Sequence, residues 1–300
     1  MPSLDDNSLR EVLEHLVHGA GPGEVEVLAR GDDALVARVG DAVVKVHASG
    51  TGEAALEAQL RAAARLEAVL LAPVTTLVER RAGRSITRWP RATPLAADPS
   101  AVPWGGLGAA LARLHAADVD RLDPEHRLPE AGGPRRLERA IRALRAAPAS
   151  AERTLVLEAH AALPQAARLH RSHRHLVHGD VHLGQVAHDG EGRLRLLDVD
   201  ELGRGDPAWD LARPAAWYAG GLMPEGAWRS FLGGYLEAGG CAVTAEDPWS
   251  VLDGPARAMV VQAAARAVVR AGGAGGLDAT DRALLATCRQ LTLAARGEGA

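Results

Sequence analysis

The sequence predicts an α+β fold, in which a small antiparallel sheet of five strands is followed by a larger, mostly helical part. Over residues 25–89, short runs of β-branched and apolar residues are separated by turns that contain Gly or Asp, as in strands joined by tight turns. From Trp104 onward, apolar residues recur every three or four positions over long segments, which predicts packed helices. Strands gathered in one half of a chain and helices in the other are typical of the α+β class.

The N-terminal elements can be assigned in order along the chain. A helix is expected over residues 5–19, and a second helix, with Thr51 as its N-cap, runs to about Val69. The strands share apolar, β-branched residues and polar turns at their ends, and we predict them at Val25–Ala29, Leu35–Val39, Ala42–His47, Val74–Arg80 and Arg84–Trp89.

A connector rich in Ala and Pro, residues 91–103, divides the chain. We therefore predict two lobes, residues 1–89 and residues 90–300. The helices of the second lobe are rich in Ala and keep helical periodicity, and we predict them at 104–117, 134–147, 151–172, 207–219, 225–238, 248–271 and 278–295.

Bulk properties exclude several classes of protein. The formal net charge of -4 provides no basic excess for a nucleic-acid partner. No run of eighteen apolar residues occurs and the N-terminus is acidic, so we expect neither a membrane span nor a signal peptide. Cys241 and Cys288 lie far apart, and we expect two buried, reduced thiols in a cytoplasmic protein. Both a monomer and a homodimer are compatible with the sequence.

The most informative stretch is His178–Gln185 together with Asp198. It places one carboxylate, Asp180, in a short loop, an amide five residues later, and a second carboxylate thirteen residues after that. Between them an Asp-Gly turn, Asp189–Gly192, separates two apolar runs, which predicts a hairpin that brings Asp198 back towards the loop. A carboxylate for a hydroxyl proton, beside two oxygen ligands for a hard divalent ion, is what phosphoryl transfer requires.

Four motifs, taken in order, resemble the aminoglycoside phosphotransferase family of small-molecule kinases. They are Val43–Val46, Leu107–Ala116, His178–Gln185 with Leu197–Asp200, and Gly205–Ala212. The resemblance spans most of the chain and implies a protein-kinase-like fold with a nucleotide-binding N-terminal lobe and a helical C-terminal lobe that holds the catalytic loop and the acceptor site. It also implies ATP or GTP as co-substrate, Mg²⁺ as cofactor, and a small-molecule hydroxyl as acceptor.

The resemblance assigns roles to Asp180 and Lys45. Asp180 is the implied catalytic residue, which orients the acceptor hydroxyl and accepts its proton. Lys45 is expected to contact the α- and β-phosphates of the nucleotide. It is the single Lys among 34 basic residues, the rest being Arg, which indicates that its strand needs a compact charge on a thin stem.

Three further parts of the nucleotide site are implied. Glu57 is the preferred ion-pair partner of Lys45 because it lies nearer the buried face of its helix than Glu53 does. The adenine ring is expected to bond the backbone around Thr87 to Trp89. The turn Arg30–Asp33 takes the place of the kinase glycine-rich loop, although it contains only Gly31 and no GxGxxG motif is present.

Asp198 and Gln185 are the implied ligands of Mg²⁺. Gln185 occupies the position usually held by Asn, and its amide oxygen is still a hard, neutral ligand. The segment His182–Gln185 also resembles the variant found in the maltokinase group of the same superfamily, which keeps sugars open as acceptors.

Other polar residues near these motifs have less specific roles. His178 is expected to support the loop through a hydrogen bond, and His182 either lines the site or packs within the loop. Asp200 either assists with the metal or acceptor or closes a turn. Asp206 and Asp210 fit structural roles at the start of a turn and in the first turn of a helix, and both could also face the acceptor pocket.

The acceptor itself is the least specified part. Residues 201–300 contain 11 acidic and 9 basic residues, which is too balanced to predict a carboxylate-lined pocket for a polycation. An aminoglycoside or other antibiotic ranks first because Gly205–Ala212 matches the antibiotic kinases, and a sugar or amino sugar ranks second. Two other interpretations are a degenerate kinase that binds nucleotide without turnover, and a metallohydrolase centred on His178, Asp180 and His182.

Overall fold

The structure, a computed structural model, describes residues 7–20, 25–31, 34–95, 102–272 and 276–297. The chain divides into two compact units. The first unit comprises Met1–Ala96, Asp120–Pro129 and Leu183–Asp200, and the second comprises Ala97–Val119, Glu130–His182 and Glu201–Ala300. The predicted lobes, residues 1–89 and 90–300, stay a prediction.

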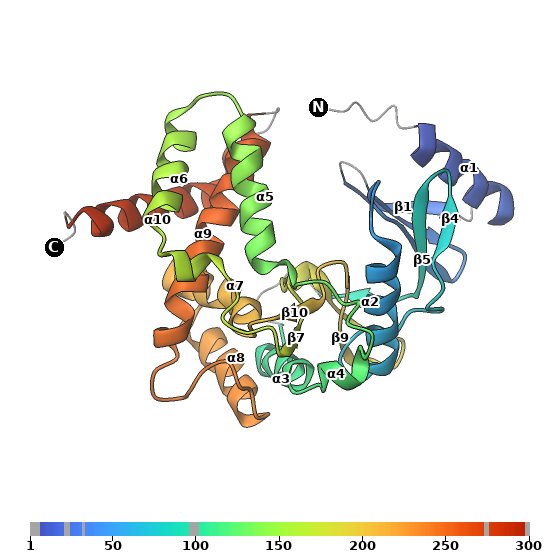
Figure 1. Cartoon of the computed structure of the whole chain (residues 1–300). Coiled ribbons are helices and arrows are strands. Elements are labelled where there is room, and N and C mark those ends of the chain that lie inside the picture. The colour runs from blue at the N-terminus through green and yellow to red at the C-terminus, as the bar shows by residue number, and fades with distance from the viewer. Residues whose placement is uncertain (1–6, 21–24, 32–33, 96–101, 273–275, 298–300) are drawn as a thin grey trace. The chain divides into compact units, whose positions relative to one another are not determined.

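An antiparallel sheet of five strands forms the centre of the first unit, in the order β1-β2-β3-β5-β4 (Figure 1). Its strands are β1 (Val25–Arg30), β2 (Leu35–Val39), β3 (Ala42–Val46), β4 (Glu79–Arg81) and β5 (Arg84–Pro90). In the central strand β3, Lys45 pairs with Val36 of β2 on one side and with Thr87 of β5 on the other. This register places Lys45 in the middle of the sheet.

Helix α1 (Asn7–Ala20) covers one face of this sheet. Leu9, Val12 and Leu16 of α1 pack in one buried cluster with side chains from three strands, namely Leu35, Val44, Val46 and Ile86. Side chains alternate between the two faces of a strand. Lys45 therefore points to the face opposite α1, and His47, two residues later, lies on the same side.

Helix α2 (Glu53–Arg65) begins after Gly52. The prediction that Thr51 is its N-cap is wrong, because the Thr51 hydroxyl donates to the carbonyl of Ala48 at 2.8 Å and makes no bond to the first turn. The short helix α4 (Val119–Leu122) was not predicted.

The predicted hairpin is present in the first unit. It consists of β8 (Val186–His188) and β9 (Leu194–Leu196), follows the 3₁₀ turn η3 (Leu183–Gln185), and pairs with the short strand β6 (Thr93–Pro94). Asp189 closes its turn, since its side chain accepts from the backbone N–H groups of Glu191 and Arg193 at 3.0 and 2.9 Å. The hairpin returns the chain to Asp198.

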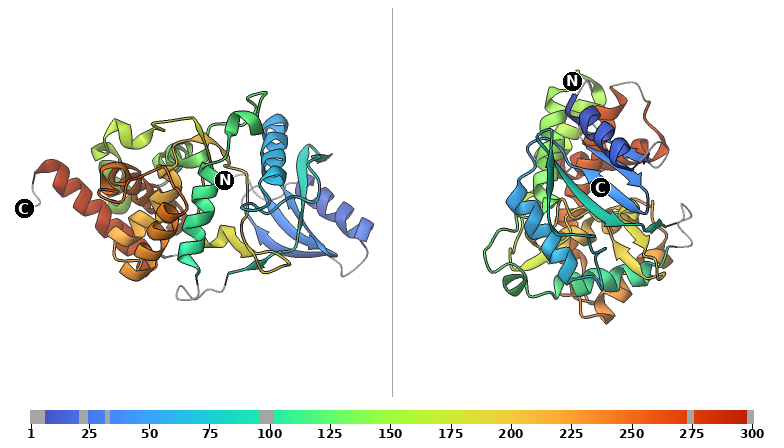
Figure 2. Two further views of the ribbon diagram at one scale, coloured as in Figure 1. Left: turned by 90° about the horizontal axis from the view of Figure 1, so that it is seen from below. Right: turned by 90° about the vertical axis from the view of Figure 1, so that its right-hand side faces the viewer.

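The second unit is mostly helical. Its long helices are α3 (Trp104–His115), α5 (Gly132–Ala146), α6 (Ala151–Ala162), α7 (Ala208–Ala219), α8 (Glu225–Glu237), α9 (Trp249–Ala271) and α10 (Ala279–Arg296). Helix α9 packs against α5, α6, α7 and α10, as Figures 1 and 2 show. The remaining elements are the strand pair β7 (His175–Val177) and β10 (Gly203–Gly205) and the 3₁₀ turn η2 (Gln165–Arg168).

Helices α3 and α8 approach each other closely at Gly108. A Cβ atom at this position would lie 2.0 Å from the carbonyl oxygen of Phe231, so only glycine allows the contact. The sheet of five antiparallel strands and the helical unit confirm the predicted α+β class.

Among the helices of the described residues, none combines the length and apolar character that crossing a membrane requires. Both cysteines are free thiols. Cys288 is buried as predicted, but Cys241 is exposed, so the expectation that it is buried is wrong.

Candidate active site

Lys45 is held between two carboxylates in the first unit. Its Nζ lies 2.5 Å from Asp198 Oδ1 and 2.8 Å from Asp200 Oδ2. The Lys45 side chain is only 13% exposed, so the ammonium group has lost much of its hydration and depends on these partners. The network joins β3 to the segment that follows β9.

His47 and two residues of β5 lie beside Lys45 and its two carboxylate partners. The buried side chain of His47 has Nδ1 3.3 Å from Asp200 Oδ1 and Nε2 2.9 Å from the hydroxyl of Thr87. The Trp89 indole N–H donates to the same hydroxyl at 2.9 Å. On α2, the amide of Gln59 donates to the backbone carbonyl of Asp200 at 3.0 Å. Asp200 is therefore fixed by its backbone as well as by its side chain.

The charges in this network shift two pKa values in opposite directions. Burial alone would lower the pKa of Lys45, but the carboxylates of Asp200 and Asp198 outweigh it and leave that pKa raised. Burial alone would raise the pKa of Asp200, but the hydrogen bond from His47 and the charge of Lys45 hold that pKa below its usual range. The charged forms of both groups are favoured.

Replacing Lys45 with Met should lower the free energy of unfolding at pH 7 by about 2 kcal/mol, which is less than for a fully buried pair because solvent reaches the carboxylates. The lowered pKa of Asp200 means that the stabilisation is present above the unfolded carboxyl pKa of about 3.9 and is lost as the pH falls. The raised pKa of Lys45 means that it is lost again above about pH 10.4.

Urea unfolding of wild type and Lys45→Met at pH 3, 7 and 9 measures this difference. It should be constant between pH 7 and 9 and smaller at pH 3, where the stabilisation has begun to be lost. The matched control is Arg38→Met on the neighbouring strand, which removes an exposed pair with Glu26 and should cost less than about 1 kcal/mol. Equal losses at pH 3 and pH 7 would contradict the ion-pair explanation.

Gln185 lies against Asp198. Its amide nitrogen donates to Asp198 Oδ2 at 3.1 Å, and the Asp200 N–H donates to Asp198 Oδ1 at 3.3 Å. Asp198 has φ 57°, a left-handed conformation that Asp tolerates better than most residues. A carboxylate beside an amide whose oxygen can turn towards the same point is a donor set that fits Mg²⁺, which takes few protein ligands and completes its shell with phosphates and water.

The other predicted parts of the nucleotide site lie as follows. Glu57 lies 3.6 Å from Arg61 on its own helix, and the ion pairs that Lys45 makes among the described residues go to Asp198 and Asp200. The predicted pairing of Lys45 with Glu57 is therefore not the arrangement in this structure. Asp32 and Asp33, in the turn predicted to cover the phosphates, lie outside the described residues.

The backbone around Thr87 to Trp89, predicted to bond adenine, is already engaged in part. The Arg88 carbonyl between these two residues accepts from the Val74 N–H at 2.9 Å, and β5 pairs with β3 through Trp89. The side chains of Thr87 and Trp89 lie beside His47 instead.

The loop that carries Asp180 belongs to the second unit, where the fully buried carboxylate of Asp210 holds its backbone. Asp210 accepts from the N–H groups of His178 and Gly179 at 2.8 Å each, and His115 Nε2 lies 3.0 Å away. His115 in turn lies 2.9 Å from the Tyr235 hydroxyl. Burial would raise the pKa of Asp210, yet the hydrogen bond and charge of His115 leave it lowered. The Asp210 side chain has no exposed surface, which fits its predicted structural role.

Gly179 allows the sharp turn before Asp180. It has φ +82°, and a Cβ atom there would lie 2.3 Å from the carbonyl oxygen of Glu201 and 2.6 Å from the N–H nitrogen of Gly132. Any other residue would strain the backbone and collide with two segments at once.

Asp180 itself contacts two arginines from different helices. Its Oδ1 pairs with Arg136 of α5 and lies 3.4 Å from Arg213 of α7. Arg136 also donates to the Gly179 carbonyl at 3.3 Å, and Arg213 donates to the Val181 carbonyl at 3.0 Å. His182 Nε2 lies 3.9 Å from Asp180 Oδ2. His178 is buried, and its ring nitrogen accepts from the Asp180 N–H at 3.4 Å.

Four polar residues of these networks were missed by the sequence analysis: His47, Gln59, Arg136 and Arg213. A signal existed for His47, because it follows Lys45 by two positions on a strand and must share its face. Arg136 and Arg213 had no such signal in the sequence, because almost every basic residue of this chain is Arg and two more arginines do not stand out.

The metallohydrolase interpretation loses its support. Within the part of the chain that the structure describes, no three His, Cys, Asp or Glu side chains are placed to share a metal ion. Asp206 accepts from Arg171 and from the Ala208 N–H, each at 3.0 Å, and lies two residues before α7.

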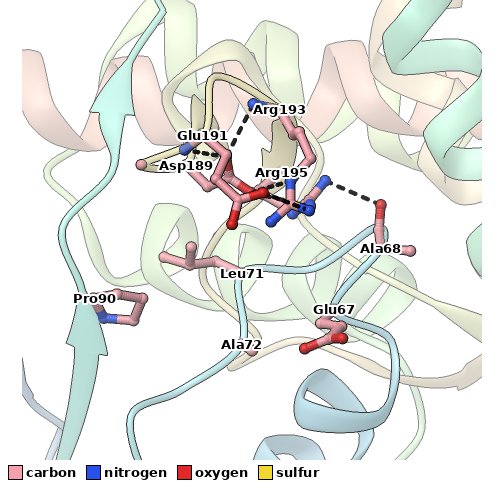
Figure 3. Close-up of a pocket in the computed structure, with 10 residues that line it drawn as sticks. Glu67, Ala68, Leu71, Ala72, Pro90, Asp189, Glu191, Arg193 and Arg195 are labelled. Atoms are coloured by element: carbon pink, nitrogen blue, oxygen red, sulfur yellow. Dashed lines mark hydrogen bonds and ion pairs between the residues drawn. The ribbon is translucent and has the colours of Figure 1, made fainter.

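A cavity of about 630 Å³ in the first unit contains none of the predicted site residues (Figure 3). Its walls include Leu71, Pro90 and the hairpin. Arg193 and Arg195 point towards Asp189, each 3.0 Å from its Oδ2, and Arg195 also donates to the Ala68 carbonyl at 3.2 Å. These contacts stabilise the hairpin, and they pair the charges of Arg193 and Arg195 with that of Asp189.

Comparison with solved structures supports the fold. A choline/ethanolamine kinase family protein from Mesorhizobium loti has a TM-score of 0.63 at 18% identity, over 96% of this chain and 98% of its own. A macrolide 2′-phosphotransferase from Brachybacterium faecium has a TM-score of 0.56 at 20% identity, over 93% and 97%. The GDP complex of wild-type aminoglycoside 2′-phosphotransferase-IIIa has a TM-score of 0.55 at 15% identity, over 98% and 100%. These likenesses confirm the predicted protein-kinase-like fold.

No curated protein matches the sequence. The model of the phosphotransferase enzyme family, APH, matches residues 24–252, which is most of the chain. This match confirms the resemblance inferred from the four motifs. The chain belongs to the phosphotransferase enzyme family and is a small-molecule kinase that transfers a phosphoryl group to a hydroxyl with a nucleotide as co-substrate.

Proposed function

We propose that this kinase transfers the γ-phosphoryl group of ATP or GTP to a hydroxyl of a small molecule, with Asp180 as the catalytic residue. The observation that carries the proposal is the network of Lys45, Asp198 and Gln185, which gathers the groups that phosphates and a divalent ion need. Asp180 precedes Gln185 by five residues, on a loop whose backbone is held by Asp210.

In the proposed step, the acceptor hydroxyl oxygen bonds to the γ-phosphorus while the bond from that phosphorus to the β–γ bridging oxygen breaks. The electron pair of the broken bond leaves with the nucleoside diphosphate, and the hydroxyl proton passes to Asp180. Since both arginines contact Oδ1, the proton goes to Oδ2. A carboxylate suffices, because phosphoryl transfer depends mainly on positioning and charge neutralisation.

Lys45 would bind the α- and β-phosphates, and Asp198 and Gln185 would hold Mg²⁺, which neutralises phosphate charge when bound. Asp200 and His47 position Lys45. The adenine contact at the backbone of Thr87 and Trp89, the maltokinase-like character of His182–Gln185, the cytoplasmic location and a monomeric or homodimeric state stay predictions.

Among solved structures of similar fold are macrolide and aminoglycoside phosphotransferases, so antibiotics stay candidate acceptors alongside sugars. The degenerate-kinase alternative rests on Gln185 and on the glycine-poor turn after β1.

The test is ADP and GDP release by the purified chain with Mg²⁺, across aminoglycosides, macrolides, peptide antibiotics, hexoses, amino sugars, choline and sugar acids. We expect release that depends on one class of acceptor and on one nucleotide. A thermal shift with nucleotide and Mg²⁺, accompanied by no acceptor-dependent release, would instead indicate a protein that binds nucleotide without turnover.

A further inference from the structure

We infer that the acceptor carries an anionic group, a carboxylate or a phosphate, near the hydroxyl that is phosphorylated, and that Arg213 binds this group. The inference rests on the proposed function and names the substrate class of the same site. It follows from the side chains that surround Asp180 within the second unit.

Guanidinium groups from two different helices meet at Asp180. Arg136 of α5 and Arg213 of α7 contact its carboxylate directly. Burial lowers the pKa of both arginines; the charge of Arg213 lowers that of Arg136 further, and the charge of Arg266 on α9 adds to the effect on both. These helices are packed together, since α9 contacts both α5 and α7. The carboxylate of Asp180 therefore faces two guanidinium groups.

The neighbouring acidic residue is already neutralised. Glu201 pairs with Arg139 and lies 3.7 Å from Arg135, both on the first turns of α5. Arg135 Nε is buried and has no hydrogen-bond partner among the described residues. The N-terminus of α5 presents the positive end of its helix dipole, although its first N–H group, that of Gly132, already donates to the Glu201 carbonyl at 3.1 Å.

This surplus of positive charge decides between acceptor classes. A polycation such as an aminoglycoside would require a pocket lined with carboxylates, whereas here Asp180 and Glu201 are each paired with arginines and Asp210 is fully buried. A carboxylate or phosphate on the acceptor would balance the surplus and would be bound by charge-assisted hydrogen bonds.

Arg213 is the side chain best placed to bind the anion. It is 20% exposed, compared with 7% for Arg136, so a ligand can reach it. Its guanidinium lies 5.4 Å from the ring centre of Trp217, which restrains its plane. Its contacts to Val181 and Asp180 use Nε and Nη2. A guanidinium has five N–H groups, so donors remain for a second anion.

The experiment compares acceptors that differ mainly in charge: gluconate, glucose 1-phosphate, glucose and glucosamine, with glycerate, glycerol and choline as a smaller series. The kcat/KM for diphosphate release should be highest for an anionic member, and the carboxylate and phosphate arms show which anion is preferred. Arg213→Gln should raise the KM for that member about 10- to 100-fold, the loss expected for one charge-assisted hydrogen bond, while the KM for the nucleotide stays unchanged.

Two variants complete the design. Arg213→Lys keeps the charge and should recover part of the lost affinity, which calorimetry with the anionic member measures independently of turnover. Arg257→Gln on α9, an exposed pair with Asp253, is the matched control and should change nothing. A preference for neutral or cationic acceptors, or an unchanged KM in Arg213→Gln, would overturn this inference. The proposed kinase function would still stand. Absence of release with every acceptor and nucleotide overturns the proposed function as well.

Discussion

Replacing Asp180 with Asn should lower acceptor-dependent phosphoryl transfer by about 10²- to 10⁴-fold, the range expected when a positioned base is lost. The amide keeps the shape and the hydrogen-bond acceptor that Arg136 and Arg213 contact, but it cannot take the hydroxyl proton. Initial rates of diphosphate release measure kcat, and a titration followed by calorimetry measures nucleotide affinity, which should stay within about twofold of wild type because the proposed nucleotide ligands are untouched.

The control for this substitution is Glu158→Gln, which removes an exposed surface pair with Arg296 and should leave the rate unchanged. A rate in Asp180→Asn within tenfold of wild type would show that the proton leaves by another route and would remove Asp180 from the catalytic role.

Replacing Asp210 with Ala should lower the free energy of unfolding by about 3–5 kcal/mol, as expected when one partner of a buried charged network is removed. The N–H groups of His178 and Gly179 would lose their acceptor in the interior, and His115 would lose its carboxylate. Urea unfolding at pH 7 followed by circular dichroism measures the loss. Because the pKa of Asp210 is lowered, the loss should shrink as the pH falls below about 4.

Asp253→Ala provides the comparison, since this exposed carboxylate pairs with Arg257 on the same helix and should contribute less than about 0.5 kcal/mol. A loss in Asp210→Ala no greater than this would mean that the loop holds its conformation without the carboxylate.

Much of the fold could be predicted because its signals are local. The hairpin was visible in the Asp-Gly turn between apolar runs, and β2 has the predicted bounds, Leu35–Val39. Errors arose where local preference was overridden. The helix predicted over 151–172 ends at Ala162 because Pro164 follows and cannot continue it. The strand predicted at Val74–Arg80 reduces to Glu79–Arg81, and Val74 and Leu77 are 61% and 75% exposed despite their apolar character.

The candidate site was only partly predictable, because its contacts join segments far apart in the sequence. Lys45 and Asp198 are 153 residues apart. Recognising the hairpin in the sequence was not enough to predict their contact, because its position relative to the sheet also had to be known. Glu57 had the expected spacing for the partner of Lys45, but spacing on one helix does not reveal that two carboxylates after β9 reach the ammonium group. Arg136 lies on a helix that precedes Asp180 in the sequence, and Arg213 lies on a helix that follows it. No local sequence pattern predicts that both contact Asp180.

The contact of Lys45 with Asp198 and Asp200 has a consequence for the order in which ligands bind. A phosphate that takes the ammonium group must displace these carboxylates, and a divalent cation that takes Asp198 must displace the ammonium group. Each ligand therefore releases the group that the other needs, so nucleotide and metal should bind with positive cooperativity. By thermodynamic linkage, the factor by which the metal tightens nucleotide binding equals the factor by which the nucleotide tightens metal binding.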